Sequence, residues 1–291
     1  MADSPNNPEP LDPDLEALET IADAAEGPPP PAPTSAAAGP IIEFSHVSIS
    51  FGDHAVLDDV SFTVQRGETL CILGRSGVGK SVSLRLLMGF LKPDSGSISV
   101  EGQEIAGLNE EGLRAIRKRV TMVFQNGALF DSLSVRENVA FPLREHGGLN
   151  EEQLEELVSR LIGLVGAEDV VDELPASLST GRKRAVAIAR ALAARPEVVL
   201  YDEPTTMVDP LIAKRLGNLI QRLKVQLGFT SIVVTHDIRF AERLADTVLF
   251  LDGGRAAYFG PLEGFLSSND PHIQQFLTLD EYELPGVNRE Q

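Results

Sequence analysis

The chain has 291 residues, of which 43% are hydrophobic, so it can build one large α/β domain or two small ones. Its net charge of -18, from 43 acidic and 25 basic residues, disfavours nucleic acid as a partner because no basic stripe is present. A single cysteine, Cys71, excludes an internal disulfide framework, and its apolar neighbours predict an inert, packed thiol.

Residues 1–40 form a segment of distinct composition at the N-terminus. It holds ten of the 19 prolines, eight acidic residues and no Lys or Arg, which predicts a disordered, extended tail. Within it, Leu15, Leu18 and Ile21 share one face of a short predicted helix, which is either transient or a docking element. The segment lacks the basic and apolar regions of a signal peptide, and no stretch approaches the ~18 apolar residues of a membrane span. We therefore expect the chain not to cross a membrane itself.

Alternating apolar residues open the folded part near Pro40. They predict an edge strand over Ile42–Phe51 and a second strand over Val56–Val64. Phe51, at the end of the first strand, is expected either to join the core or to stack on a nucleobase.

The segment Gly74–Ser81 has the spacing of a phosphate-binding loop. An apolar strand leads into it and a helix over Ser81–Met88 leads out, so the N-terminus of this helix adds its dipole to the anion site. The glycines let main-chain N–H groups point at phosphate oxygens, Lys80 supplies a charge for the outer phosphates, and Ser81 offers a hydroxyl to Mg²⁺. The candidate phosphate-binding residues are Gly74, Arg75, Ser76, Gly77, Val78, Gly79, Lys80 and Ser81.

A helical subdomain, at about residues 127–180, interrupts an alternation of strands and helices. Within it, Asn150 and Gln153 form a predicted capping box at the start of an amphipathic helix. The alternation itself implies a largely parallel sheet, whose ligands bind at the carboxyl ends of the strands. The other predicted elements are strands over Ser97–Val100, Val120–Phe124, Val198–Tyr201 and Thr230–Thr235, helices over Glu110–Lys118, Gly181–Ala194 and Leu211–Leu227, and a closing hairpin over Thr247–Phe259.

Polar residues follow several of these predicted strands. Asp202 and Glu203 come directly after one apolar strand, His236 follows another, and Gln125 follows a third. One carboxylate can hold Mg²⁺, and the next can polarise a water for in-line attack on a γ-phosphoryl group. The amide of Gln125 can reach either the metal or the water. Together with the phosphate loop, these residues predict a nucleoside triphosphatase.

Six motifs in order, over about residues 41–260, resemble an ATP-binding-cassette (ABC) nucleotide-binding domain. They are the phosphate loop, Gln125, Leu178-Ser179-Thr180-Gly181-Arg182, Tyr201-Asp202-Glu203-Pro204, Asp209 and His236. The resemblance implies an α/β fold of the P-loop NTPase type, with a mainly parallel sheet, an antiparallel β edge and an inserted helical subdomain. It assigns residues 41–278 to this domain and leaves residues 279–291 as a C-terminal tail.

The same resemblance implies ATP hydrolysis with Mg²⁺ between two head-to-tail copies, most simply a homodimer. Glu203 would be the catalytic base, His236 would sense the γ-phosphate, and Gln125 would assist both catalysis and the metal. Ser81 and Asp202 would also serve the metal, and Phe51 would stack on adenine. Residues of the second copy would complete each site: Ser179 and Gly181 at the γ-phosphate, and Asp209 as the link between the sites.

A narrower resemblance concerns the segment 124–146, which is similar to that of ATPases from the Mla and other MCE-associated phospholipid transporters. Residues 270–277 also resemble the tail of that group. This implies an integral-membrane permease of Mla/MCE type as partner, with the chain held peripherally at the cytoplasmic face of the inner membrane. The permease would dock in the groove after Gln125, against apolar residues that are otherwise core: Leu129, Phe130, Leu133 and Phe141.

The signature departs from the usual family pattern at Thr180 and Arg182, and Met207-Val208 replaces the commoner Gly-Leu before Asp209. We expect Ser179 and Gly181 to keep their contacts while Arg182 strengthens the ATP-bound dimer. Three alternatives stay open: an ATPase of an importer for another solute, an ABC protein that acts on DNA or ribosomes, and a poorly hydrolysing regulatory ABC protein.

Overall fold

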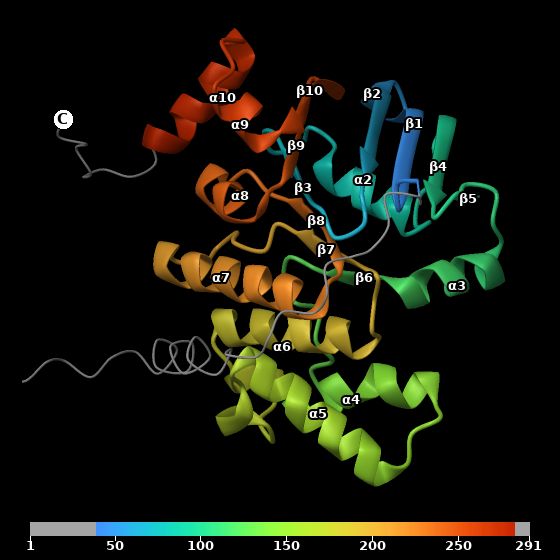
Figure 1. The fold of residues 1–291 in the computed structure, drawn as a ribbon, viewed down its shortest axis with the longest axis vertical. Coiled ribbons are helices and arrows are strands. Elements are labelled where there is room, and N and C mark those ends of the chain that lie inside the picture. Colours follow the sequence, from blue (N-terminus) through green and yellow to red (C-terminus); the bar gives the residue numbers. More distant parts are fainter. Residues whose placement is uncertain (1–38, 283–291) are drawn as a thin grey trace, which may run out of the picture.

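The computed structural model describes residues 39–282, which form two β-sheets and a set of helices (Figure 1). The strands are β1 (Ile42–Phe51), β2 (His54–Val64), β3 (Thr69–Leu73), β4 (Ser95–Val100), β5 (Gln103–Glu104), β6 (Val120–Val123), β7 (Val198–Asp202), β8 (Thr230–Val234), β9 (Thr247–Asp252) and β10 (Arg255–Pro261). The α-helices are α2 (Lys80–Leu87), α3 (Glu110–Arg119), α4 (Val135–His146), α5 (Glu151–Val165), α6 (Thr180–Ala193), α7 (Pro210–Leu227), α8 (Ile238–Leu244), α9 (Leu262–Leu266) and α10 (Pro271–Tyr282).

The first sheet is antiparallel, with the strand order β2-β1-β4-β5. The prediction that Ile42–Phe51 is an edge strand is wrong, because β1 pairs with β2 on one side and with β4 on the other. Ile42, for example, lies opposite Val64 of β2 and opposite Val100 of β4. Alternation along a strand reports which face is buried, but it carries no information about whether the strand has one neighbour or two.

The second sheet has the order β10-β9-β3-β8-β7-β6, and its pairs from β9 to β6 are parallel. Every residue of β3, β7 and β8 is buried, as expected for strands covered on both faces. Because β3, β6, β7 and β8 are parallel, the loops that follow them leave from the same edge of the sheet. Cys71 lies in β3 with no exposed surface, and burial raises the pKa of its thiol.

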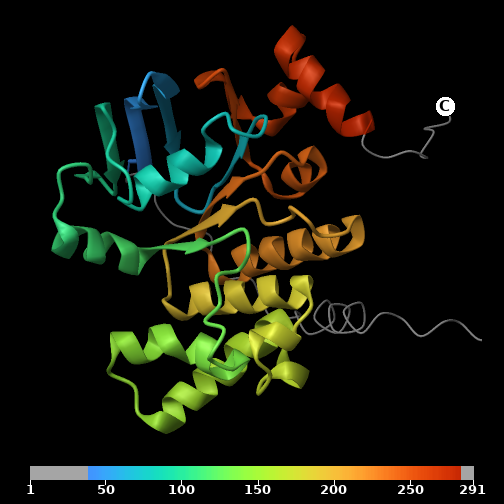
Figure 2. The ribbon, with the colours of Figure 1, turned by 180° about the vertical axis from the view of Figure 1, so that it is seen from behind.

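The helices α4 and α5 lie at one end of the molecule, with α6 between them and the central sheet (Figures 1 and 2). The predicted capping box at α5 is confirmed: Gln153 N–H donates to Asn150 Oδ1 at 2.9 Å, and Asn150 N–H donates to Gln153 Oε1 at 3.1 Å. A second capping box, between Ser134 and Glu137, begins α4. These caps fix where both helices start.

At the other end, α9 and α10 pack on the β9–β10 hairpin through Phe265, Ile273 and Phe276, which are all buried. The helix predicted around Leu15, Leu18 and Ile21 lies outside the described residues, as does most of the predicted tail 279–291. Within residues 39–282, no helix is both long enough and apolar enough to cross a bilayer.

Candidate functional site

The predicted phosphate loop connects β3 to α2, and two of its glycines are required by the backbone. Gly74 has φ +148°, and a Cβ there would lie 2.5 Å from the Leu251 carbonyl oxygen. Gly79 has φ +107° and caps α2, and a Cβ there would lie 2.7 Å from Leu57 Cδ2. The loop is therefore packed closely against neighbouring segments. Its main chain leads directly into the N-terminus of α2, where a phosphate can bind.

Lys80 lies inside this loop with only 5% of its surface exposed. Its Nζ donates to the carbonyl oxygens of Gly74 at 2.8 Å and Arg75 at 3.2 Å, and it lies 3.2 Å from Glu203 Oε1. The ammonium group is thus held between the loop and the end of β7. A cation in this position can neutralise an anion bound over the loop.

Glu203 and His236, predicted from separate strands, are in contact. His236 Nδ1 donates to Glu203 Oε2 at 2.8 Å, and the Thr206 hydroxyl donates to the same oxygen at 3.1 Å. Burial alone would raise the pKa of the Glu203 carboxyl, but the His236 hydrogen bond and the Lys80 ammonium outweigh burial and hold this pKa below its ordinary value. The hydrogen bond to Glu203 likewise raises the pKa of His236, against the opposing effect of burial. Glu203 is therefore ionised at neutral pH and can accept a proton from water.

Asp202, the last residue of β7, meets the first turn of α2. The Ser81 hydroxyl donates to Asp202 Oδ1 at 2.6 Å, and burial raises the pKa of this carboxyl. A carboxylate and a hydroxyl beside a phosphate loop are hard oxygen donors of the kind Mg²⁺ prefers. The residues present therefore fit this metal, which would supply charge for the phosphate oxygens.

A cavity of about 420 Å³ brings most of the predicted site residues together. Phe51 lines it with 50% of its surface exposed, and Gln125, which follows β6, lines it too. The lining consists of Phe51, His54, Val56, Ser76, Gly77, Gly79, Lys80, Ser81, Val82, Gln125, Glu203, Thr206 and His236. An aromatic face, a phosphate loop and an activated carboxylate thus share one space, as nucleotide hydrolysis requires.

Seven predicted site residues do not line this cavity: Gly74, Arg75 and Val78 of the loop, Asp202 at the end of β7, and Ser179, Gly181 and Asp209 on other elements. Ser179 caps α6 by accepting a hydrogen bond from the Arg182 N–H at 3.3 Å, and the guanidinium of Arg182 pairs with Asp169 at 2.5 Å. Asp209 caps α7 through the N–H groups of residues 211 and 212. Ser179 and Asp209 are exposed helix caps, available to a second molecule rather than to the cavity of their own chain.

Two residues that contact the site were not predicted from the sequence. Thr206 holds the Glu203 carboxylate, and Arg184 of α6 binds the main chain just after β7. Thr206 stands three residues after Glu203, so its position in the motif was a usable signal. Arg184 offered none, because a basic residue near the start of a helix normally faces solvent.

Comparison with known proteins places the chain in a family. The sequence model of the ABC transporter family matches residues 57–206. The methionine import ATP-binding protein MetN of Brucella abortus is 41% identical over 255 residues, which cover 87% of this chain and 69% of MetN. The probable ribonucleotide transport ATP-binding protein mkl of Mycobacterium tuberculosis is 37% identical over 239 residues, covering 82% of this chain and 67% of mkl.

Solved structures agree with this fold. The protein cbiO1 from Clostridium perfringens, part of the ABC transporter complex cbiONQ, has a TM-score of 0.73 and 29% identity, and the match covers 84% of this chain and 96% of that one. The dimeric ATP-binding cassette MJ0796, in a post-hydrolysis state bound to ADP and Pi, has a TM-score of 0.69 and 29% identity over 76% of this chain and 98% of that one. The chain therefore belongs to the ABC transporter family as an ATP-binding cassette, an ATP hydrolase coupled to transport.

Proposed function

We propose that two copies of the chain bind and hydrolyse ATP at sites that they share. The single observation that carries the proposal is the cavity in which Lys80, Glu203 and His236 meet Phe51. In this proposal Phe51 stacks on the adenine, and the loop amides with Lys80 hold the phosphates. Glu203 takes a proton from the attacking water. His236 keeps the Glu203 carboxylate oriented and contacts the γ-phosphate.

Ser81, Gln125 and Asp202 are the proposed ligands of Mg²⁺, directly or through water. The Ser81 hydroxyl already donates a hydrogen bond to Asp202, so these two groups lie side by side at the loop. The second copy would supply Ser179 and Asp209, which are helix caps, and Gly181 in the first turn of α6, none of which lines the cavity of its own chain. The dimeric state of the related cassette MJ0796 supports this arrangement.

We propose import of a small solute as the transport reaction. The support is the 41% identity to a methionine import ATPase over 87% of this chain, which exceeds the identity to the mkl protein. The chain would act at the cytoplasmic face of the inner membrane, held there by a permease.

Phospholipid transport through an Mla/MCE-type permease is the second candidate. It is favoured by the segment 124–146 and by what its apolar residues do in the structure. Phe130 and Phe141 keep 44% and 41% of their surface exposed and lie against each other, with ring centroids 4.7 Å apart, whereas Leu129 packs against the core. An exposed aromatic pair on the helical subdomain provides an apolar contact for a membrane partner.

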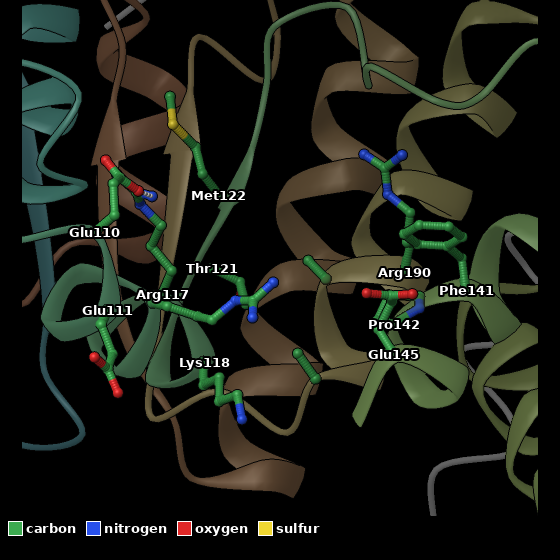
Figure 3. A pocket seen from close by; sticks show the side chains of 13 residues that line it. Glu110, Glu111, Arg117, Lys118, Thr121, Met122, Phe141, Pro142, Glu145 and Arg190 are labelled. Atoms are coloured by element: carbon green, nitrogen blue, oxygen red, sulfur yellow. Dashed lines mark hydrogen bonds and ion pairs between the residues drawn. The ribbon is translucent and has the colours of Figure 1, made fainter. Parts of the chain in front are cut away.

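The proposed docking site for either permease is a groove of about 1080 Å³ between α3 and α4. Figure 3 shows Arg117 and Lys118 on one side of this groove, with Phe141 and Arg190 on the other. The groove combines this aromatic face with charges of both signs, which suits an amphipathic cytoplasmic segment of a permease with charged and apolar residues. Its charged lining residues are Glu110, Glu111, Arg114, Arg117, Lys118, Glu145 and Arg190.

Reconstitution with the permease encoded beside the chain separates the two candidates. One set of vesicles tests uptake of labelled methionine, and another tests movement of labelled phospholipid between leaflets or to an acceptor. ATP-dependent methionine uptake supports the importer, whereas ATP-dependent phospholipid movement without uptake supports the second candidate. Lack of hydrolysis by the reconstituted complex, with ATP still bound, would favour a regulatory protein and contradict both.

A further inference from the structure

Arg184 is a buried cation whose partners are main-chain carbonyls. It lies in the second turn of α6, with 5% of its surface exposed. Its Nη1 donates to the carbonyl oxygens of Glu203 at 3.1 Å and Pro204 at 2.7 Å, and its Nη2 donates to that of Thr206 at 2.7 Å. The three hydrogen bonds hold one turn of chain, Glu203–Thr206, and Arg184 does not line the cavity.

This turn has an unusual backbone that needs support. Glu203 has φ +48°, in the left-handed region that a residue with a side chain rarely occupies. Its N–H donates to the Val234 carbonyl at 2.9 Å, and its own carbonyl accepts from Arg184. The peptide groups on both sides of Glu203 are therefore fixed, one by β8 and the other by α6. Such a conformation persists only where its surroundings determine it.

The position of the Glu203 carboxylate depends on this backbone. Its Oε1 lies 3.2 Å from Lys80 Nζ and its Oε2 lies 2.8 Å from His236 Nδ1, so a rotation at Glu203 Cα would break both contacts. Thr206, the last residue of the turn, also donates to this carboxylate. Arg184 thus acts on the carboxylate twice, through the main chain of Glu203 and through that of Thr206.

We propose that Arg184 is a positioning residue for hydrolysis, which holds the Glu203 carboxylate in its reactive orientation from the helix that begins at Ser179. The inference rests on the proposed role of Glu203 as base. Ser179, the N-cap of α6, is assigned to the nucleotide bound by the second copy, and Arg184 of the same helix holds Glu203 of its own chain. The helix α6 therefore connects the two nucleotide sites of the dimer. Arg184 itself is not among the residues that line the cavity.

Kinetics of Arg184→Gln and Arg184→Lys test this role, with Arg222→Gln as the matched control. Arg222 is also partly buried and donates to a main-chain carbonyl, that of Leu164 at 3.1 Å, but it lies on α7 away from the cavity. We expect Arg184→Gln to lower kcat about 100-fold while the KM for ATP changes less than about threefold. The Lys variant, which keeps a charged donor, should retain more of kcat, and Arg222→Gln should leave kcat unchanged.

A double-mutant cycle distinguishes positioning from a general structural effect. If Arg184 acts through Glu203, adding Arg184→Gln to Glu203→Gln should lower the residual rate less than about threefold. A second full loss of about 100-fold would show that Arg184 acts independently of Glu203 and would overturn the proposal. An equal loss of kcat in Arg222→Gln would also overturn the proposal, because it would show that the loss in Arg184→Gln comes from general destabilisation.

Hydrogen exchange of the isolated chain tests the clamp without hydrolysis. Amides in the peptide 202–209 should exchange at least about tenfold faster in Arg184→Gln than in wild type, and no faster in Arg222→Gln. Equal exchange in wild type and Arg184→Gln would overturn the inference even in an active enzyme. A wild-type complex with the permease that lacks ATPase activity would instead refute the proposed function, and faster exchange in Arg184→Gln would then still support the clamp.

Discussion

Replacing Tyr201 with phenylalanine should stabilise the protein, although most core substitutions destabilise. Tyr201 lies in β7 with no exposed surface, and its hydroxyl has no hydrogen-bond partner within residues 39–282. A buried, unpaired hydroxyl destabilises the folded state by about 1–3 kcal/mol. Removing it leaves a small cavity, which destabilises the folded state by no more than about 1 kcal/mol. The expected gain is therefore about 1 kcal/mol, or about 2–4 °C in Tm for a domain of this size.

Tyr258→Phe is the matched control for this prediction. The Tyr258 hydroxyl donates to the Pro261 carbonyl at 2.7 Å, so its removal should cost about 1 kcal/mol. Urea denaturation followed by circular dichroism gives the free energy of unfolding of wild type and both variants. A loss of about 1 kcal/mol or more in Tyr201→Phe would show that this hydroxyl is bonded in solution, for example to a buried water, and would refute the reasoning.

Two further predictions concern the site. Lys80→Ala should weaken ATP binding at least about 100-fold, because charge-assisted hydrogen bonds contribute about 1.5–3 kcal/mol each. The control Lys92→Ala, at an exposed position, should bind ATP normally. Titration with a fluorescent ATP analogue measures both affinities, and equal affinities of the two variants would contradict the role of Lys80. The raised pKa of His236 means that its bond to Glu203 stabilises the fold fully below the ordinary value of 6.5 and less as the pH rises through the raised value. His236→Asn should therefore lower the free energy of unfolding more at about pH 6 than at about pH 9, and an equal loss at both would contradict the pairing.

The phosphate loop and the strand-end residues could be predicted because each depends on local spacing. Gly74 and Gly79 both have positive φ in this loop, and Glu203 and His236 each follow an apolar run. Parallel strands then bring those ends to one edge of the sheet without further information. The capping box at Asn150 was predictable for the same reason, since both of its partners lie within one turn.

Contacts between distant elements could not be predicted in this way. The pairing of β1 with two neighbours depends on where β4 lies, which the alternation of β1 does not encode. Arg184 reaches a turn about twenty residues further along the chain, and only the packing of α6 against the central sheet makes it buried. For Phe130 and Phe141 the sequence left permease contact and core packing both open, and only the folded helical subdomain shows that the two side chains keep 44% and 41% of their surface exposed.

ATP turnover by wild type and Glu203→Gln, each purified with the permease encoded beside the chain, tests the central claim most directly. We predict steady hydrolysis by wild type, and a variant that binds ATP with similar affinity, loses at least about 100-fold in rate and accumulates as an ATP-bound dimer. Equal turnover by the two proteins would contradict Glu203 as the base and, with it, the site described around Lys80 and His236.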